Sequence, residues 1–249
     1  MKIDYLSDIG RQRSQNQDRV ALFENGKRQL AVIADGIGGN RGGDIAAATT
    51  VRLLGQNFCQ SAPKSVKHAK KWLQDQVTLA NQLLLKKANE KLNYRGMGTT
   101  LVAAVTLPKG VIVVANIGDS RGYILHDRQL NQVTVDHSLV NELVKNGDMT
   151  EQQARRSPQK NIITRAIGVS PDAEVEVNAF VLQAGDQLLL CSDGLSKLVE
   201  HDTLTAVLLD STLTVTAKCE RLVALANNAG GLDNITDGRH FIPKVFQSN

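Results

Sequence analysis

Residues 99–125 read TTLVAAVTLPKGVIVVANIGDSRGYIL, and this stretch decides the fold class. It contains three runs rich in aliphatic and β-branched residues, Thr99–Thr106, Val111–Ile117 and Arg121–Leu125, which predict strands. The links between the runs contain PKG and GDS and are too short to hold a crossover helix. The three strands are therefore predicted to be antiparallel neighbours, which argues against a doubly wound parallel sheet.

The rest of the chain mixes the two kinds of secondary structure. Apolar runs predict buried strands at Gln29–Ala34 and Asp186–Cys191, and apolar spacing predicts helices at Asp44–Gln56, Ser65–Asn93 and Thr214–Asn228. Two short helices are expected between residues 138 and 157, the first ending at Gly147 and the second beginning with a Thr150/Gln153 capping box. The pattern predicts an α+β fold, and residues 1–249 contain no linker or repeat that would divide a single domain.

The composition excludes several classes of protein. Apolar residues make up 42% of the 249 positions and charged residues 22%, which excludes disordered and coiled-coil chains. The formal charge of +4 does not argue for nucleic acid binding, and the lysines between 64 and 91 are interpreted as a solvated helix face. The three cysteines form no CxxC pair, and neither a signal peptide nor an 18-residue apolar stretch is present. We expect a cytoplasmic protein without membrane or nucleic acid partners.

The positions of five aspartates suggest a chemistry. Asp35 and Asp193 each follow a buried apolar run and precede a glycine, while Asp18, Asp119 and Asp233 lie in polar or glycine-rich turns. Several hard oxygen donors without histidine or cysteine clusters favour Mg²⁺ or Mn²⁺ over zinc. Each Asp-Gly pair alone is also an ordinary turn signal, and composition does not show that the five aspartates converge.

Eight motifs, in order along almost the whole chain, resemble one family. They are SDIGRQRSQNQD (7–18), VIADGIGGNRGGDIAA (32–47), GMGTTLVAAV (96–105), ANIGDSRGYIL (115–125), DHSLVNELVKNG (136–147), NIITRAIG (161–168), LLLCSDGLS (188–196) and GGLDNIT (230–236). Each motif is weak alone, but the ordered set is specific. The chain resembles the metal-dependent serine/threonine protein phosphatases of type 2C, in their compact bacterial form.

The resemblance implies an α-β-β-α sandwich, in which two antiparallel sheets are flanked by helices and a binuclear metal site lies at one end. It implies Mn²⁺ or Mg²⁺ as cofactor. Asp35 would bridge both metals and the Gly36 carbonyl would bind one of them. Asp193 and Asp233 would hold the other metal, and Asp18 would act largely through metal-bound water. A water bridging the two metals would attack phosphorus.

The resemblance also implies a substrate and further roles. Asp119, with Asp193, would bind a weaker third metal found in bacterial relatives, and Arg13 would grip the substrate phosphate with its planar guanidinium. A flap from about 136 to 168 would lie near the site and help to choose substrates. The implied partners are proteins phosphorylated on serine or threonine and a bacterial kinase whose action the enzyme reverses, and we expect a monomer.

Four departures from the family pattern qualify this interpretation. Ile37 and Asn40 stand where animal and bacterial relatives carry histidines, and Ser157-Pro158 replaces the usual His-Pro of the flap, so no imidazole acid is assigned. The polar run 237–240 follows DNIT where an apolar strand is usual, so the last strand is expected to be shortened or shifted. A catalytically weak phosphoprotein-binding module is the alternative. The five acidic positions favour an enzyme.

Overall fold

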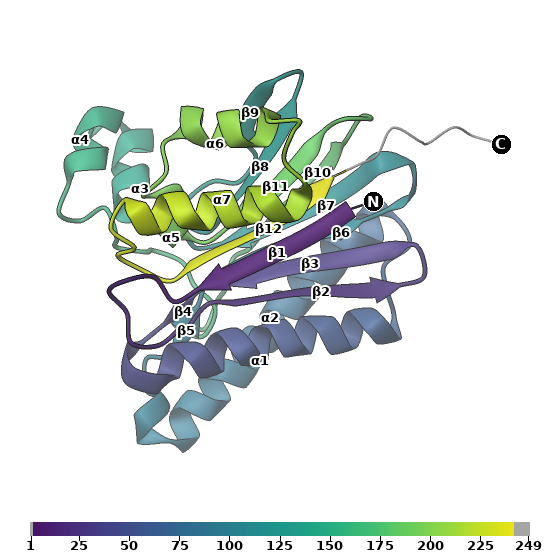
Figure 1. The fold of residues 1–249 in the computed structure, drawn as a ribbon. Coiled ribbons are helices and arrows are strands. Elements are labelled where there is room, and N and C mark those ends of the chain that lie inside the picture. The colour runs from purple at the N-terminus through teal and green to yellow at the C-terminus, as the bar shows by residue number, and fades with distance from the viewer. Residues whose placement is uncertain (1, 242–249) are drawn as a thin grey trace.

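Two five-stranded antiparallel sheets form the centre of the molecule (Figure 1). The structure is a computed structural model that describes residues 2–241. The first sheet has the order β1-β12-β11-β8-β9 and the second the order β10-β7-β6-β3-β2. The strands of the first sheet are β1 (Lys2–Asp8), β12 (Ile235–Phe241), β11 (Gln187–Cys191), β8 (Arg121–His126) and β9 (Gln129–Gln132). Those of the second are β10 (Glu176–Val181), β7 (Val111–Ile117), β6 (Leu101–Thr106), β3 (Arg28–Ala34) and β2 (Arg19–Asn25).

Helices cover the outer face of each sheet, which gives the four layers predicted from the resemblance (Figure 1). Two long helices, α1 (Gly39–Gln60) and α2 (Val66–Glu90), pack on the second sheet. On the first sheet lie α5 (Asp193–Ser196), α6 (His201–Leu209) and α7 (Val215–Asn228). The remaining elements are α3 (Leu139–Asn146), α4 (Glu151–Arg156), the 3₁₀ turns η1 (Leu92–Tyr94) and η2 (Pro108–Gly110), and a two-stranded ladder of β4 (Gly36–Ile37) and β5 (Gly98–Thr99).

Three apolar clusters match these layers. Leu54, Phe58 and Leu73 belong to the cluster between the second sheet and its helices. Leu189 and Leu222 belong to the cluster beneath α7. A third cluster fills the space between the sheets, where the alternate residues of the central strands meet. The central strands β3, β6, β7, β8 and β11 each contribute to two clusters through their alternating side chains. The sandwich therefore fixes the register of these strands.

Most elements predicted from the sequence are confirmed, including both features of the short helices. Gly147 ends α3 in the left-handed region, at φ 82°, and Thr150 and Gln153 form the capping box of α4. The pairing of β6 with β7 is also as predicted. The predicted pairing of the next two strands is wrong, because β7 belongs to the second sheet and β8 to the first. The link Gly118–Ser120 carries the chain from the second sheet to the first, and it is as short as the loop of a β-hairpin.

The predicted shortening of the last strand is also wrong. β12 runs from Ile235 to Phe241 and pairs along its whole length with β1, from Asp8↔Ile235 to Lys2↔Phe241. It also pairs with β11, so it lies between two neighbours in the sheet. A Cβ added at Gly238 would make ordinary contacts of 3.7, 3.8 and 3.9 Å with the side chains of Tyr5, Ile33 and Val20. Sheet pairing on both sides therefore outweighs the polar sequence.

Two of the three cysteines, Cys191 and Cys219, are buried, whereas Cys59 is exposed. Within residues 2–241, none of the helices has the length and apolar character needed to cross a membrane.

A substitution at Gly118 tests how closely the link between the two sheets is packed. Its φ is +101°, and a Cβ there would lie 2.6 Å from the Thr100 side chain. We expect Gly118→Ala to lower the free energy of unfolding by about 2–4 kcal/mol, because backbone strain and overpacking act together. The matched control is Gly26→Ala, where φ is +61° and nothing lies within 4 Å of the added carbon, so only about 1 kcal/mol should be lost. Denaturant unfolding measures both. Equal losses in the two variants would show that the crossing is not closely packed.

Candidate active site

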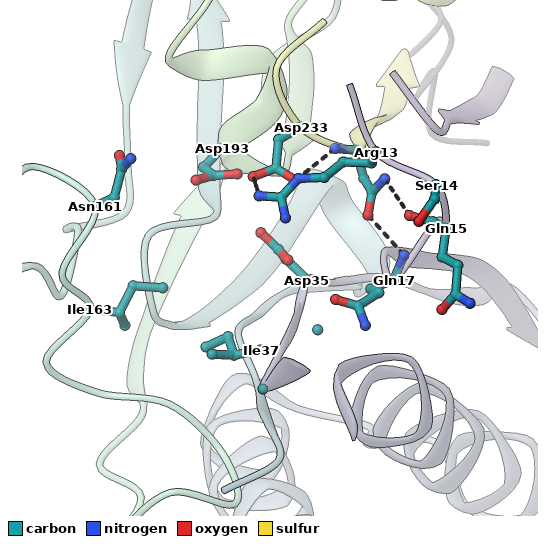
Figure 2. A pocket seen from close by; sticks show the side chains of 13 residues that line it. Arg13, Ser14, Gln15, Gln17, Asp35, Ile37, Asn161, Ile163, Asp193 and Asp233 are labelled. Atoms are coloured by element: carbon teal, nitrogen blue, oxygen red, sulfur yellow. Dashed lines mark hydrogen bonds and ion pairs between the residues drawn. The ribbon is translucent and has the colours of Figure 1, made fainter. Parts of the chain in front are cut away.

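A cavity of about 580 Å³ opens at one end of the sandwich (Figure 2). Its lining comes from loops at the ends of strands of both sheets and from the segment between α4 and β10. The lining residues are Arg13, Ser14, Gln15, Gln17, Asp35, Gly36, Ile37, Gly38, Asn161, Ile163, Asp193, Asp233 and Asn234. In Figure 2 the side chains of Asp35, Asp193, Asp233 and Arg13 point toward one another. Five of the seven residues that the sequence predicted for the site therefore line one cavity.

Asp35 lies where β3 ends, and the backbone around it is fixed on both sides. Its N–H donates to Thr100 Oγ1 at 3.0 Å, and its carbonyl accepts from Thr100 N and from Thr99 Oγ1, each at 2.9 Å. The next residue, Gly36, packs so closely on Gly43 of α1 that a Cβ would lie 2.3 Å from that backbone. The Asp-Gly pair thus places the Asp35 carboxyl rigidly at the strand end.

Asp18 is buried beside the cavity, with 2% of its surface exposed. Its Oδ2 accepts a hydrogen bond from Thr236 Oγ1 at 2.7 Å, whereas its Oδ1 has no hydrogen-bond partner among the described residues. Burial raises the pKa of Asp18 to about 7, and the charges of Asp193 and Asp233 add to the rise. Hydrogen bonds from Thr236 and Ser192 oppose it.

Asp233 and Arg13 face each other across the cavity mouth. Arg13 Nη2 donates to Asp233 Oδ2 at 2.8 Å, and 53% of the arginine side chain is exposed. Asn234 holds the two loops together, because its Oδ1 accepts from Gln17 N at 2.8 Å and its Nδ2 donates to the carbonyls of Ile9 and Gln15. The loop that carries the arginine is therefore tied to the loop that carries the acid.

Asp119 lies in the crossing between the sheets and is buried, with 2% of its surface exposed. A neighbouring residue supports this turn, since Gly118 N–H donates to His137 Nδ1 at 3.1 Å. His137 Nε2 lies 3.2 Å from Glu176 Oε1, and burial lowers the pKa of this histidine. The neutral imidazole therefore accepts from Gly118 and donates to Glu176, so His137 is a structural hydrogen bonder.

Lys197 lies between two of the carboxylates, and the sequence analysis missed it. Its Nζ is 2.7 Å from Asp119 Oδ2 and 2.7 Å from Asp193 Oδ2. Burial lowers the pKa of Lys197, but the charges of Asp193 and Asp119 outweigh burial and the net shift is upward. The available signal was spacing: Lys197 follows Asp193 by four residues, one turn along a helix.

The electrostatics of the site require positive charge. Burial, followed by the charges of Asp18 and Asp193, raises the pKa of Asp35 well above its usual range. Burial and Asp193 likewise raise the pKa of Asp119, although Lys197 opposes this rise. Among the side chains that the structure describes, two basic groups, Arg13 and Lys197, pair with members of this set of five carboxyl groups. Hydrogen bonds and these two basic groups stabilise the anions in part, and added cations would stabilise them further.

The donor set fits Mg²⁺ or Mn²⁺, and one observation of the structure supports this. Oδ1 of Asp18, Asp119 and Asp193 is buried in each case and makes no hydrogen bond with the described residues. Buried carboxylate oxygens without donors are suited to a hard divalent ion. Within residues 2–241, no three acidic, histidine or cysteine side chains stand together as a ready metal-binding group. The assignment of ligands to metals therefore stays a prediction.

The comparisons with known proteins identify the family. A model of the family "Protein phosphatase 2C" matches residues 10–228. The chain belongs to the protein phosphatase 2C family. It is 40% identical over 240 residues to "Serine/threonine phosphatase stp" of Listeria welshimeri, which covers 95% of this chain and 94% of that protein. It is 39% identical over 237 residues to "Protein phosphatase PhpP" of Streptococcus pneumoniae, which covers 95% of each.

Solved structures confirm the fold predicted from the resemblance. The serine/threonine phosphatase of S. agalactiae is 38% identical and superposes with a TM-score of 0.92, covering 97% of this chain and 99% of that one. The serine/threonine phosphatase PstP/Ppp of Mycobacterium tuberculosis is 32% identical, with a TM-score of 0.88 over 97% and 98% of the two chains. This phosphatase 2C chain therefore has the α-β-β-α architecture along nearly its whole length.

The raised pKa of Asp18 makes a prediction for the metal-free protein. Below about pH 4 this carboxyl is protonated in both the folded and the unfolded chain, and its contribution to stability is present. As the pH rises through about 7 that contribution is lost, because ionisation is harder in the folded state. Asp18→Asn keeps an oxygen for Thr236 but cannot ionise. In excess chelator it should exceed wild type in unfolding free energy by about 1–3 kcal/mol at pH 8.

Denaturant unfolding of both proteins at pH 4 and pH 8 measures this difference. The advantage of Asp18→Asn should shrink toward zero at pH 4. An advantage that is the same at both pH values, or absent at pH 8, would contradict the role assigned to the buried charge.

Proposed function

We propose that this phosphatase 2C chain is a protein-serine/threonine phosphatase that hydrolyses phosphoserine and phosphothreonine with Mn²⁺ or Mg²⁺. The observation that carries the proposal is the convergence of Asp35, Asp193 and Asp233 with Arg13 in one cavity, next to the buried Asp18. The names of the relatives support the substrate class. Carboxylates collect divalent cations, and the arginine fork recognises a phosphate.

The metal-holding residues would be divided as the resemblance implies. Asp35 and the Gly36 carbonyl would hold one ion, and Asp193 and Asp233 the other, with Asp35 shared by both. Asp18 would act on this pair from its buried position. When bound, the two ions supply Lewis acid catalysis and an activated water for in-line attack on phosphorus. The chain's own contribution is to hold these carboxyl groups at fixed strand ends.

Arg13 is the residue that binds the phosphate before and during the reaction. Its guanidinium is more than half exposed and needs only to leave Asp233, which it contacts at 2.8 Å, to reach a ligand in the cavity. With a metal held at Asp233, that carboxylate would no longer depend on the guanidinium for charge balance, and Arg13 would be free to bind the phosphate. Metal loading and phosphate binding would therefore favour each other.

No histidine lines the described cavity, which bears on the leaving group. Ile37 contributes an apolar side chain where an imidazole acid could stand. His137 is buried and held by Gly118 and Glu176, so it does not serve instead. We propose that solvent water protonates the serine or threonine oxygen as it leaves. Poor leaving groups would then be the slowest substrates.

The substrate polypeptide would lie against the flap, about residues 136–168. Asn161 and Ile163 of this segment line the cavity, and Figure 2 places both on the far side of Asp35 from Arg13 and its loop. They offer one amide and one apolar surface to residues flanking the phosphate. The partners would be phosphoproteins made by a bacterial serine/threonine kinase, and the protein would act as a monomer.

Metal dependence tests the proposal. Hydrolysis of a phosphothreonine peptide should require added Mn²⁺ or Mg²⁺ and stop in excess EDTA. Asp35→Asn should lower kcat by about a thousandfold or more while the protein stays folded, because the shared carboxylate is lost. Asp172→Asn is the matched control, since that side chain is exposed and lies outside the cavity. A folded wild-type protein with no metal-stimulated turnover would instead support the phosphoprotein-binding alternative, and full turnover in EDTA would contradict metal catalysis.

Arg13→Ala tests the phosphate contact. Its KM for phosphopeptides should rise about tenfold or more, because a charge-assisted contact made before the chemical step is removed. Arg11→Ala is the control: Arg11 is also exposed and near the site, but it pairs with Asn228. Steady-state kinetics on the same peptide compares the two. An unchanged KM in Arg13→Ala would place the phosphate elsewhere.

A further inference from the structure

The ammonium of Lys197 lies between two carboxylates, as a bound metal cation would. Its Nζ makes two contacts of 2.7 Å, one with Asp119 Oδ2 and one with Asp193 Oδ2. The two acids come from different places: Asp119 from the crossing between the sheets and Asp193 from the first turn of α5. A single side chain therefore links the crossing to the end of β11.

The carboxylates on either side have capacity for more than this lysine. Oδ1 of Asp119 and Oδ1 of Asp193 are both buried and make no hydrogen bond with the described residues. Each acid thus gives one oxygen to the ammonium and keeps one without a donor. An ammonium is a compact point charge with three donors, so it neutralises such a pair only in part.

The lysine also has a route away from the pair. Its side chain is 23% exposed, whereas that of Asp119 is 2% exposed and that of Asp193 16%. The acids are fixed by a buried turn and a strand end, but the lysine stem has four rotatable carbons and leads toward solvent. Exchange of the cation therefore needs only a side-chain movement.

We propose that Lys197 is a resident cation of the Asp119–Asp193 pair and competes with a divalent ion for it. The lysine holds the two acids together when this third position has no metal. A third ion binds only at a concentration high enough to displace the ammonium, so the lysine makes that position the weakest of the site. The inference rests on the proposed function only in taking Mn²⁺ or Mg²⁺ as the ions that the site binds.

Counting bound ions tests the competition without any substrate. Free and bound Mn²⁺ are measured by electron paramagnetic resonance as the metal-free protein is titrated. Lys197→Gln should bind one more Mn²⁺ than wild type over the same range, or bind its weakest ion about tenfold more tightly. Lys71→Gln is the control. Lys71 also pairs with an aspartate four residues away, Asp75, but the Lys71 side chain is 74% exposed on the surface of α2. It should bind Mn²⁺ as wild type does.

A double variant locates the added ion. Asp119→Asn combined with Lys197→Gln should return the count and affinities to those of wild type, because the gained position has lost a carboxylate. An extra ion that survives in the double variant would lie elsewhere and would overturn the proposal. Identical titrations of Lys197→Gln and wild type would overturn it as well.

Two further measurements need no metal-loaded variant. In chelator, Lys197→Gln should melt at a lower temperature than wild type, because the carboxylates of Asp119 and Asp193 lose the ammonium between them. The double variant should recover part of this loss, because Asp119→Asn removes one of the two facing charges. In wild type, a lysine displaced from the two acids should react more readily. Chemical acetylation of Lys197, measured by mass spectrometry, should therefore rise as the Mn²⁺ concentration is raised toward millimolar. A failure of metal-dependent hydrolysis with these results intact would refute the proposed function alone. Unchanged melting in chelator together with unchanged acetylation would refute the competition alone.

Discussion

Burial of several carboxyl groups close to one another is the constraint on which the site depends. Asp18, Asp35 and Asp119 each have a raised pKa, with burial as the largest cause and neighbouring aspartates as the next contributors. The charge of Asp193 contributes to the rise in all three. A fold that crowds acids in this way loses stability unless cations accompany them. Two basic side chains offset part of the charge, and divalent ions would offset the rest.

The sandwich is what makes this crowding possible. Asp35 follows a strand of the second sheet and Asp193 a strand of the first, while Asp119 lies where the chain passes between the two. Close packing of glycine backbones, as at Gly36 and Gly43, keeps the strand ends from relaxing apart. The core between the sheets provides the rigidity, so the acids are held near one another at the expense of local stability.

The part of the site that could be predicted from the sequence is the part defined by local pattern. A buried run followed by Asp-Gly located Asp35 and Asp193, because a strand end and a turn are both local signals. The convergence of those acids with Asp233 came from the family resemblance, since it depends on contacts between residues far apart in the chain. The pairing of β1 with β12 joins the two ends of the described chain and has no local signal.

The errors have physical causes of the same kind. A link of three residues suits a hairpin as well as a passage between stacked sheets, and the choice between them is made by packing around Gly118, which a linear pattern does not contain. The polar run 237–240 suggested a shortened or shifted last strand, but two neighbouring strands supply its hydrogen bonds. Lys197 was missed because an isolated lysine on a helix is usually a solvated residue, and only the structure places it between two acids.

The dependence of stability on metal concentration tests the central claim most directly. The free energy of unfolding of the wild-type protein is measured at pH 8 over several decades of free Mn²⁺. If the carboxyl cluster binds two ions that the unfolded chain does not, stability should rise by about 2.7 kcal/mol for each tenfold increase in Mn²⁺ above the dissociation constants. A free energy of unfolding that does not change with Mn²⁺ would contradict the account, because the crowded carboxylates would then be stable without the cations that they are proposed to bind.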